Sequence, residues 1–211
     1  SNDSPSCSRT YSAAQAGITF GDGRPPVILH RPDLLDRTHA SIARYSKCDA
    51  DMYVELKKRA MGLEQMLAAG LYNLPSPIDP GDTVALLEFG FGDLGVGAHF
   101  AQKSAKMVID ELFETDELRA LLYRATVEWG YPVDTVGLGA GFLTFVMWTM
   151  GNWKLAIGGT HTLAKAMTQA CYREGVDLIE NTCAESIIVE DGRAVGVRTR
   201  VGDIRATRCV A

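Results

Sequence analysis

Residues 158–211 read GGTHTLAKAMTQACYREGVDLIENTCAESIIVEDGRAVGVRTRVGDIRATRCVA, a helical pattern followed by strand patterns. Two glycines precede a helical pattern that Gly175 ends. Asp191-Gly192 is typical of a two-residue hairpin turn, because both central positions of a type I′ turn need positive φ. Short β-patterns are found at residues 176–180, 186–190, 193–200 and 204–210. We therefore predict a helix, one strand of a parallel sheet and a three-stranded antiparallel meander.

The preceding residues are mainly helical in pattern, with one short β-hairpin at 17–20 and 27–30. Pro25 and Pro26 confine the second arm of this hairpin to a sheet edge, because proline has no backbone N–H to donate. Apolar residues at spacings of three and four predict helices at residues 33–45, 49–71, 98–129 and 141–150. The fold class that follows is α+β.

Three residues are expected to mark where helices begin. Asp33 should cap the first of the predicted helices, and Asp49 should open the second. Thr115 offers a new cap inside the third. The helix at 141–150 is apolar on nearly all sides, so we predict that it is buried.

The composition excludes several classes of protein. The 211 residues carry a net charge of −5 and contain no basic run, which argues against a nucleic-acid partner. No run of about 18 uncharged apolar residues is present, so no transmembrane helix is expected. The cysteines contain no C-x-x-C pair, which favours reduced thiols in a cytoplasmic protein and predicts no metal site. They are Cys7, Cys48, Cys171, Cys183 and Cys209.

Gly90–Gly95 spells GFGDLG, which matches the G-x-G-x-x-G pattern of dinucleotide-binding loops. In a nicotinamide enzyme, residues 83–89 would form the strand before this loop, and Asp110 would be the acid that binds the ribose. We interpret the motif instead as a glycine-rich break between helices, because residues 106–110 run directly into a helical pattern. An NAD-dependent enzyme remains the alternative.

Gly158 and Gly159 stand directly before a predicted helix. Two glycines at this position allow a ligand to approach the backbone, and the first N–H groups of the helix are donors for a ring carbonyl or a phosphate. The other interpretation is an ordinary helix start. His161 follows the two glycines, and its neutral form could orient a substrate or exchange a proton. It is a weak candidate for a catalytic residue.

Residues 158–211 resemble a segment shared by FAD-dependent amine oxidoreductases and phytoene-desaturase-like enzymes. The landmarks are a Gly-Gly turn, an alanine-rich helix, a glycine before a strand, and Asp-Gly-Arg before Gly196. The resemblance extends upstream in the same order through residues 20–23, 44–49, 111–119 and 141–158. It implies that this chain is the central part of such a flavoprotein. The family's N-terminal dinucleotide-binding segment and its second glycine-rich flavin segment would lie outside this chain.

The resemblance also implies roles for individual residues. In that family, backbone at the positions of Gly158 and Gly159 lies close to the flavin ring and the substrate. Ala184 stands where a valine usually meets the adenine through its backbone. Trp148 and Trp153 would face the substrate cavity.

Phe145 belongs to the same aromatic-rich, acid-poor stretch, residues 142–157, and is expected to bind substrate with the two tryptophans. Such a lining suggests an alicyclic or terpenoid-like substrate rather than a charged amine. Packing in the core is the alternative role for these aromatics. His161 lies where many relatives have a small or apolar residue.

We therefore expect a substrate-binding domain at residues 1–157 and part of an FAD-binding domain at 158–211. The expected activity is hydride transfer between an apolar substrate and FAD, in a desaturase, dehydrogenase or saturase. The expected partners are an apolar small molecule and the remaining FAD-binding segments, on the same protein or on a companion chain. Peripheral membrane contact and oligomers stay open. A non-catalytic scaffold module is a further alternative.

Overall fold

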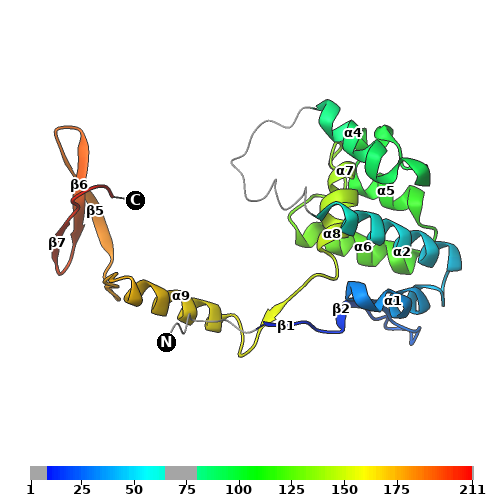
Figure 1. Ribbon diagram of the computed structural model, residues 1–211, viewed down its shortest axis with the longest axis horizontal. Coiled ribbons are helices and arrows are strands. Elements are labelled where there is room, and N and C mark those ends of the chain that lie inside the picture. Colours follow the sequence, from blue (N-terminus) through cyan, green and yellow to red (C-terminus); the bar gives the residue numbers. More distant parts are fainter. Residues whose placement is uncertain (1–8, 65–79, 211) are drawn as a thin grey trace. The chain divides into compact units, whose positions relative to one another are not determined.

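The computed structural model describes residues 9–64 and 80–210 (Figure 1). Contacts divide the chain into two compact units, which we call the helical unit, Arg9–Leu155, and the C-terminal unit, which contains Ala156–Ala211. Helices and small antiparallel sheets together give an α+β fold, as predicted from the sequence.

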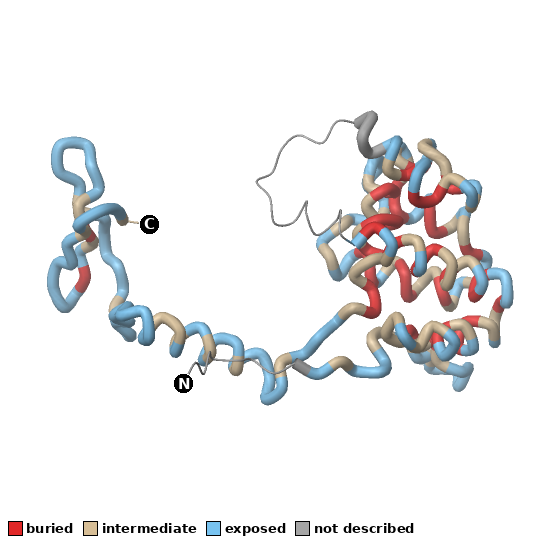
Figure 2. The backbone as a smooth tube through the Cα atoms, in the orientation of Figure 1, coloured by how far each residue is buried: buried red, intermediate tan, exposed pale blue. Residues whose placement is uncertain are grey.

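The helical unit is built around one hydrophobic core (Figure 2). Its most buried side chains come from α2, α4, α5, α6 and the helical segment at 139–149. The helices are η1 (Pro32–Leu34), α1 (Leu35–Ile42), α2 (Lys47–Gly62), α4 (Pro80–Phe91), η2 (Gly92–Leu94), η3 (Ala98–Gln102), α5 (Ala105–Leu112), α6 (Asp116–Glu128), α7 (Gly139–Gly141), η4 (Phe142–Val146) and α8 (Met147–Thr149).

The predicted hairpin is present as β2 (Ala14–Ile18) paired antiparallel with β3 (Val27–His30). Helix α1 covers the other edge of β3 with two hydroxyl groups. The backbone N–H of Ile28 donates to Ser41 Oγ, and that of His30 donates to Thr38 Oγ1, both at 2.8 Å. These bonds satisfy donors that an edge strand would otherwise leave free.

Two predicted helix starts are wrong. Helix α2 begins at Lys47, because Ser46 Oγ accepts the N–H of Asp49 and therefore caps the helix. The buried Asp49 carboxylate instead accepts the N–H groups of Glu114 and Thr115, at 2.8 and 3.0 Å, just before α6. Asp33 caps nothing, since it pairs with Arg31 and lies inside η1. The sequence placed Asp33 and Asp49 near helix starts correctly, but it did not predict the groups to which their carboxylates bond.

The predicted buried helix at 141–150 corresponds to α7, η4 and α8, which run without a break from residue 139 to residue 149. Most of its side chains are buried, as expected. Its central segment, η4, is π-helical, a wider turn that is frequent at functional sites. Two-residue strands follow: β4 (Leu155–Ala156) pairs with β1 (Arg9–Thr10).

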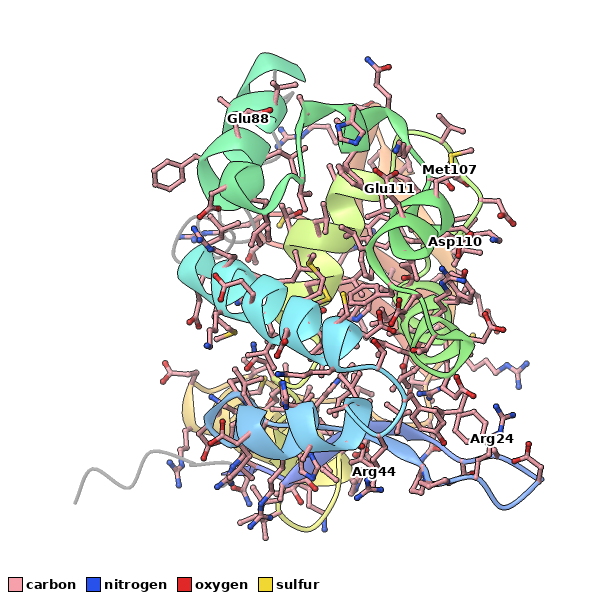
Figure 3. The ribbon with its side chains drawn as sticks, turned by 90° about the vertical axis from the view of Figure 1, so that its right-hand side faces the viewer. Arg24, Arg44, Glu88, Met107, Asp110 and Glu111 are labelled. Carbon is pink, nitrogen blue, oxygen red and sulfur yellow. The ribbon has the colours of Figure 1, made fainter. Side chains whose placement is uncertain are left out.

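The nicotinamide interpretation of Gly90–Gly95 is wrong. Residues 80–91 form helix α4, so no strand precedes the glycines, and Gly95 reverses the chain with φ of 73°. The Glu88 carboxylate accepts the N–H of Ala98 at 3.0 Å and closes this break between helices. Asp110 lies in α5 and bonds to Lys106 and Tyr123, so it is not the acid of a nucleotide site (Figure 3).

The C-terminal unit contains helix α9 (His161–Arg173) and a meander in the order β5-β6-β7. The strands are β5 (Ala184–Glu190), β6 (Arg193–Thr199) and β7 (Gly202–Arg205). Asp191 and Gly192 join β5 to β6 with φ of 49° and 76°, which confirms the predicted turn. β7 is shorter than expected, since it ends at Arg205.

The parallel strand predicted at residues 176–180 is absent. A strand exists only when a neighbouring strand accepts and donates its backbone hydrogen bonds, and the described residues offer none to this segment. Val176, Leu178 and Ile179 are accordingly exposed. Residues 176–180 have the apolar composition of a strand, but no neighbouring strand in the described chain provides the backbone hydrogen bonds.

Candidate functional site

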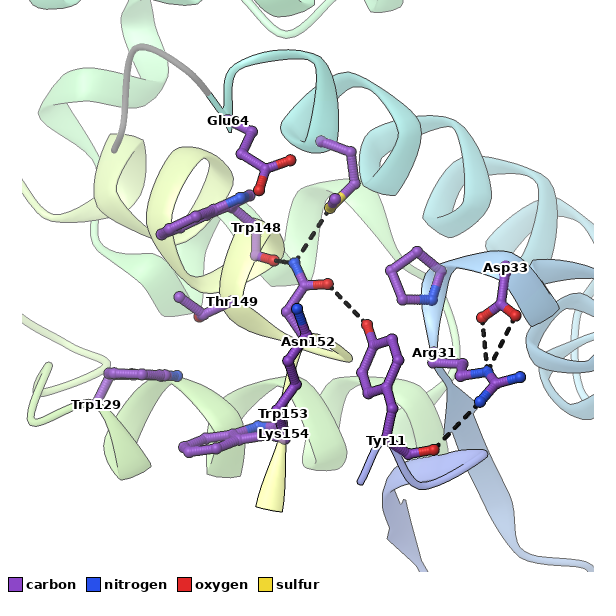
Figure 4. Close-up of a pocket in the computed structure, with 12 residues that line it drawn as sticks. Tyr11, Arg31, Asp33, Glu64, Trp129, Trp148, Thr149, Asn152, Trp153 and Lys154 are labelled. Carbon is purple, nitrogen blue, oxygen red and sulfur yellow. Dashed lines mark hydrogen bonds and ion pairs between the residues drawn. The ribbon is translucent and has the colours of Figure 1, made fainter. Parts of the chain in front are cut away.

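A pocket of about 890 Å³ opens in the helical unit between α2, the end of α8 and the N-terminal residues (Figure 4). This volume lies within the range of small-molecule sites. Its lining is aromatic on one side and polar on the other. The residues are Tyr11, Arg31, Pro32, Asp33, Met61, Glu64, Trp129, Trp148, Thr149, Asn152, Trp153 and Lys154.

All three tryptophans of the sequence line this pocket. Trp129 and Trp153 are stacked, with ring centroids 5.3 Å apart and planes 19° from parallel. Trp148 comes from α8, and its buried Nε1 has no hydrogen-bond partner among the described residues. These three tryptophans, which we call the aromatic wall, offer a broad apolar surface to a ligand.

Phe145 does not line the pocket. It packs edge-on against Trp129 with ring centroids 5.1 Å apart, and its ring lies 6.2 Å from that of Trp148. It therefore supports the tryptophans. Trp148 and Trp153, the other two predicted substrate residues, both line the pocket.

The polar side of the pocket centres on Tyr11. Its hydroxyl donates to the Gly151 carbonyl at 2.8 Å, and burial raises its pKa. Arg31 and Lys154 carry their charges 5.6 and 5.8 Å from the centre of its ring. Arg31 also pairs with Asp33 at 2.7 Å.

The charges around the pocket balance. Two cations, Arg31 and Lys154, are matched by two carboxylates, Asp33 and Glu64. Arg31 and Asp33 form an ion pair, and the formal charges of the lining sum to zero, so the lining as a whole attracts neither sign of charge over the other.

One buried lysine lies behind the aromatic wall. Lys57 of α2 is 1% exposed, and its ammonium group donates to the carbonyls of Met147, Trp148 and Met150. Burial lowers the pKa of Lys57 from 10.5 to about 7. Asn152 adds a second donor to the Trp148 carbonyl, at 2.7 Å.

Lys57, Tyr11 and Asn152 were not predicted from the sequence. A signal existed for Lys57, which follows Tyr53 by four residues and precedes Ala60 by three, both on the buried stripe of α2. A lysine at such a position indicates a buried charge with a specific partner. Tyr11 and Asn152 carry no comparable pattern. Tyr11 bonds to the Gly151 carbonyl and to the Asn152 side chain, about 140 residues away, and Asn152 bonds to the Trp148 carbonyl, so these contacts appear only in the folded chain.

The predicted cofactor residues lie in the C-terminal unit. Gly158 and Gly159 have φ of 86° and 91°, conformations that favour glycine. The N–H groups of Thr160 and His161, at the start of α9, have no acceptor in the described part of the chain. Ala184 is exposed at the start of β5, where Thr199 of β6 is its partner.

His161 is exposed and lines a separate hollow of about 330 Å³, with Lys165, Gln169 and Glu180 among its neighbours. It is thus distinct from the residues that line the aromatic pocket. The described residues hold no group of three or more side chains suited to a metal ion.

The aromatic pocket is suited to binding an apolar molecule, because three tryptophan side chains line it. Its lining holds neither histidine nor cysteine, and its tyrosine hydroxyl is committed to a backbone carbonyl. An apolar molecule in this pocket would lie against the tryptophan rings. None of the helices in the described ranges is both long and apolar enough to cross a membrane.

Comparison with known proteins connects this chain with a dehydrogenase. It is 37% identical over 187 residues to one of the subunits of limonene dehydrogenase from Castellaniella defragrans. The matched segment is 86% of this chain and 32% of that protein, so the chain spans about a third of the length of this relative. No protein-family model matches the chain.

Proposed function

We propose that this chain carries the substrate pocket of a flavin-dependent oxidoreductase that acts on neutral alicyclic hydrocarbons of the terpenoid kind. One observation carries the proposal: three tryptophans converge on a pocket without net charge, in a chain similar to a subunit of limonene dehydrogenase. An aromatic wall of this kind binds a cyclic hydrocarbon through apolar contact, and its neutral rim does not favour a charged amine.

FAD is the proposed cofactor, and the helix start of the C-terminal unit is compatible with it. No side chain stands at Gly158 or Gly159, and the two backbone N–H groups that follow have no acceptors among the described residues. Donors in this arrangement suit the carbonyl oxygens of a flavin ring or a phosphate. When bound, FAD would supply the hydride acceptor or donor. Ala184 is proposed as a further backbone contact.

The residues of the helical unit would position the substrate. Trp148 and Trp153 would hold the ring, while Phe145 keeps the tryptophans in place through Trp129. Such a pocket raises the rate of hydride transfer by fixing the substrate's orientation and excluding water. His161 stays a candidate for proton exchange. The remaining flavin-binding segments would come from the same protein or a companion chain; the relative is itself named a subunit.

Tryptophan fluorescence tests the proposal directly, because every tryptophan lines the pocket. The protein, purified with any chains that accompany it, should show saturable quenching or a spectral shift with limonene. Cyclohexylammonium, which has a ring and a charge, should bind at least about tenfold more weakly. The same preparation should show the absorbance of bound flavin and reduce an electron acceptor in the presence of limonene.

The scaffold alternative makes the opposite prediction. A module that has lost catalysis would show neither flavin absorbance nor turnover. Limonene binding without flavin in the complete assembly would support a binding module and contradict the oxidoreductase. Absence of both binding and flavin would contradict the proposed function altogether.

A further inference from the structure

The helical segment at 139–149 ends beside the pocket, and buried side chains satisfy the carbonyls at this end. A helix end leaves its last carbonyls without partners inside the helix. Lys57 Nζ donates to Met147 and Trp148 at 2.7 and 2.9 Å, and also to Met150. One ammonium group thus bonds to two carbonyls in the last turn of α8 and to the Met150 carbonyl just after it.

The chain that leaves this helix end forms much of the pocket wall. Trp148, Thr149, Asn152, Trp153 and Lys154 all line it. Two further bonds fasten the same turn: Asn152 Nδ2 donates to the Trp148 carbonyl, and the Tyr11 hydroxyl donates to the Gly151 carbonyl. Lys57 does not line the pocket itself, so its effect on a ligand must pass through these carbonyls.

We infer that Lys57 is a positioning residue for the pocket: by fixing three carbonyls it sets where Trp148 and Trp153 lie, and thereby the affinity for an apolar ligand. The identity of that ligand rests on the proposed function, but the placement of the tryptophans does not. A displacement of about 1 Å in a site can cost about a hundredfold in rate, so loss of these bonds should be measurable.

A merely structural lysine would behave differently. It would lower the stability of the helical unit without changing the affinity or the tryptophan environment of the protein that remains folded. The experiment must therefore compare affinity and emission in folded protein, and not stability alone. Lys58, the next residue along α2, is an exposed lysine and provides the matched control.

The variants are Lys57→Ala and, as control, Lys58→Ala, in the same preparation that tests the proposed function. Tryptophan emission, its quenching by acrylamide and the affinity for limonene are measured in each. The measurements are repeated with ethylammonium, which can donate to the three carbonyls, and with tetramethylammonium, which cannot. Should Lys57→Ala fail to fold, Lys57→Met keeps the apolar stem without a donor and should show the same emission shift and loss of affinity, without recovery in ethylammonium, whereas Lys57→Arg keeps a charged donor and should retain more of both.

We expect folded Lys57→Ala to have shifted emission and about tenfold lower affinity for limonene. Ethylammonium should restore both, tetramethylammonium neither, and Lys58→Ala should match the unmutated protein. Unchanged emission, or an affinity within about twofold of the unmutated protein, would overturn the inference. If the unmutated protein does not bind limonene, the proposed function fails, whereas the emission shift and its recovery with ethylammonium still decide the role of Lys57.

Discussion

The two units of this chain differ in how they bury apolar side chains. In the helical unit, large side chains such as Phe142, Leu121 and Leu56 are at most 1% exposed. In the C-terminal unit, Gly196 and Thr199 are buried among the described residues, while Ile187 and Met167 are 59% and 62% exposed. Local pattern forms the helix and meander of the second unit, but the described residues of this unit bury few apolar side chains against one another.

The strongest test of this difference removes one large apolar side chain from each unit. Phe142→Ala should lower the free energy of unfolding of the helical unit by about 3–5 kcal/mol, because it leaves a cavity in a packed core. Ile187→Ala should change the stability of the meander by less than about 0.5 kcal/mol, since this side chain is already exposed. Tryptophan fluorescence in urea reports the helical unit, and amide exchange of β6 reports the meander.

Comparable losses from both substitutions would contradict the difference between the units. They would show that Ile187 is buried in solution against a surface other than that of the described residues. The two units should be followed separately, because a chain with two units need not unfold in a single step.

Sequence reasoning succeeded where the decisive contacts are local. The Asp191-Gly192 turn, the helical stripe of α2 and the break at Gly90–Gly95 all follow from a few neighbouring residues. It failed at residues 176–180, since strand formation there depends on hydrogen bonds to another segment. The pocket positions of Trp148 and Trp153 were expected from the family resemblance. The same limit explains why the partners of Lys57, about ninety residues away, were not predicted.

A second comparison tests a buried polar contact of the helical unit against an exposed one. Asp49→Ala should lower the free energy of unfolding by about 2–3 kcal/mol, because the N–H groups of Glu114 and Thr115 lose their charged acceptor. Asp51→Ala, two residues along the same helix, breaks only an exposed pair with His39. Its effect should stay below about 0.5 kcal/mol. Urea titrations followed by tryptophan emission measure both, and equal effects would show that the bonds from Glu114 and Thr115 to Asp49 add no stability.

The pH dependence of stability also distinguishes the two units, because we expect it to arise from Lys57, a buried group of the helical unit. Lys57 has a pKa of about 7 when folded and 10.5 when unfolded, so the unfolded chain binds more protons between these values. Its contribution to stability is therefore largest above the unfolded pKa and is lost progressively as the pH falls from there to about 7. Between about pH 7 and about pH 9 the gain should be on the order of 2 kcal/mol.

The measurement is the difference in unfolding free energy between the unmutated protein and Lys57→Met, taken across this pH range. Subtraction removes the groups that titrate equally in both proteins. A difference that does not change with pH would show that Lys57 keeps its ordinary pKa, because its three carbonyl contacts then offset the loss of hydration.

The smallest expected effect concerns the Asp191-Gly192 turn, which joins β5 to β6 in the C-terminal unit and was predicted from two neighbouring residues. Gly192 has φ of 76°, so Gly192→Ala should destabilise the β5–β6 hairpin by about 1 kcal/mol, although no atom lies within 4 Å of the added Cβ. Gly62, near the end of α2, also has open space but no positive φ, and Gly62→Ala should be neutral or stabilise the helical unit by up to about 1 kcal/mol. Amide exchange in β5 and β6 measures the first effect, and urea unfolding measures the second. If Gly192→Ala left exchange unchanged, the turn would not control the hairpin, and contacts beyond the meander would have to hold the strands together.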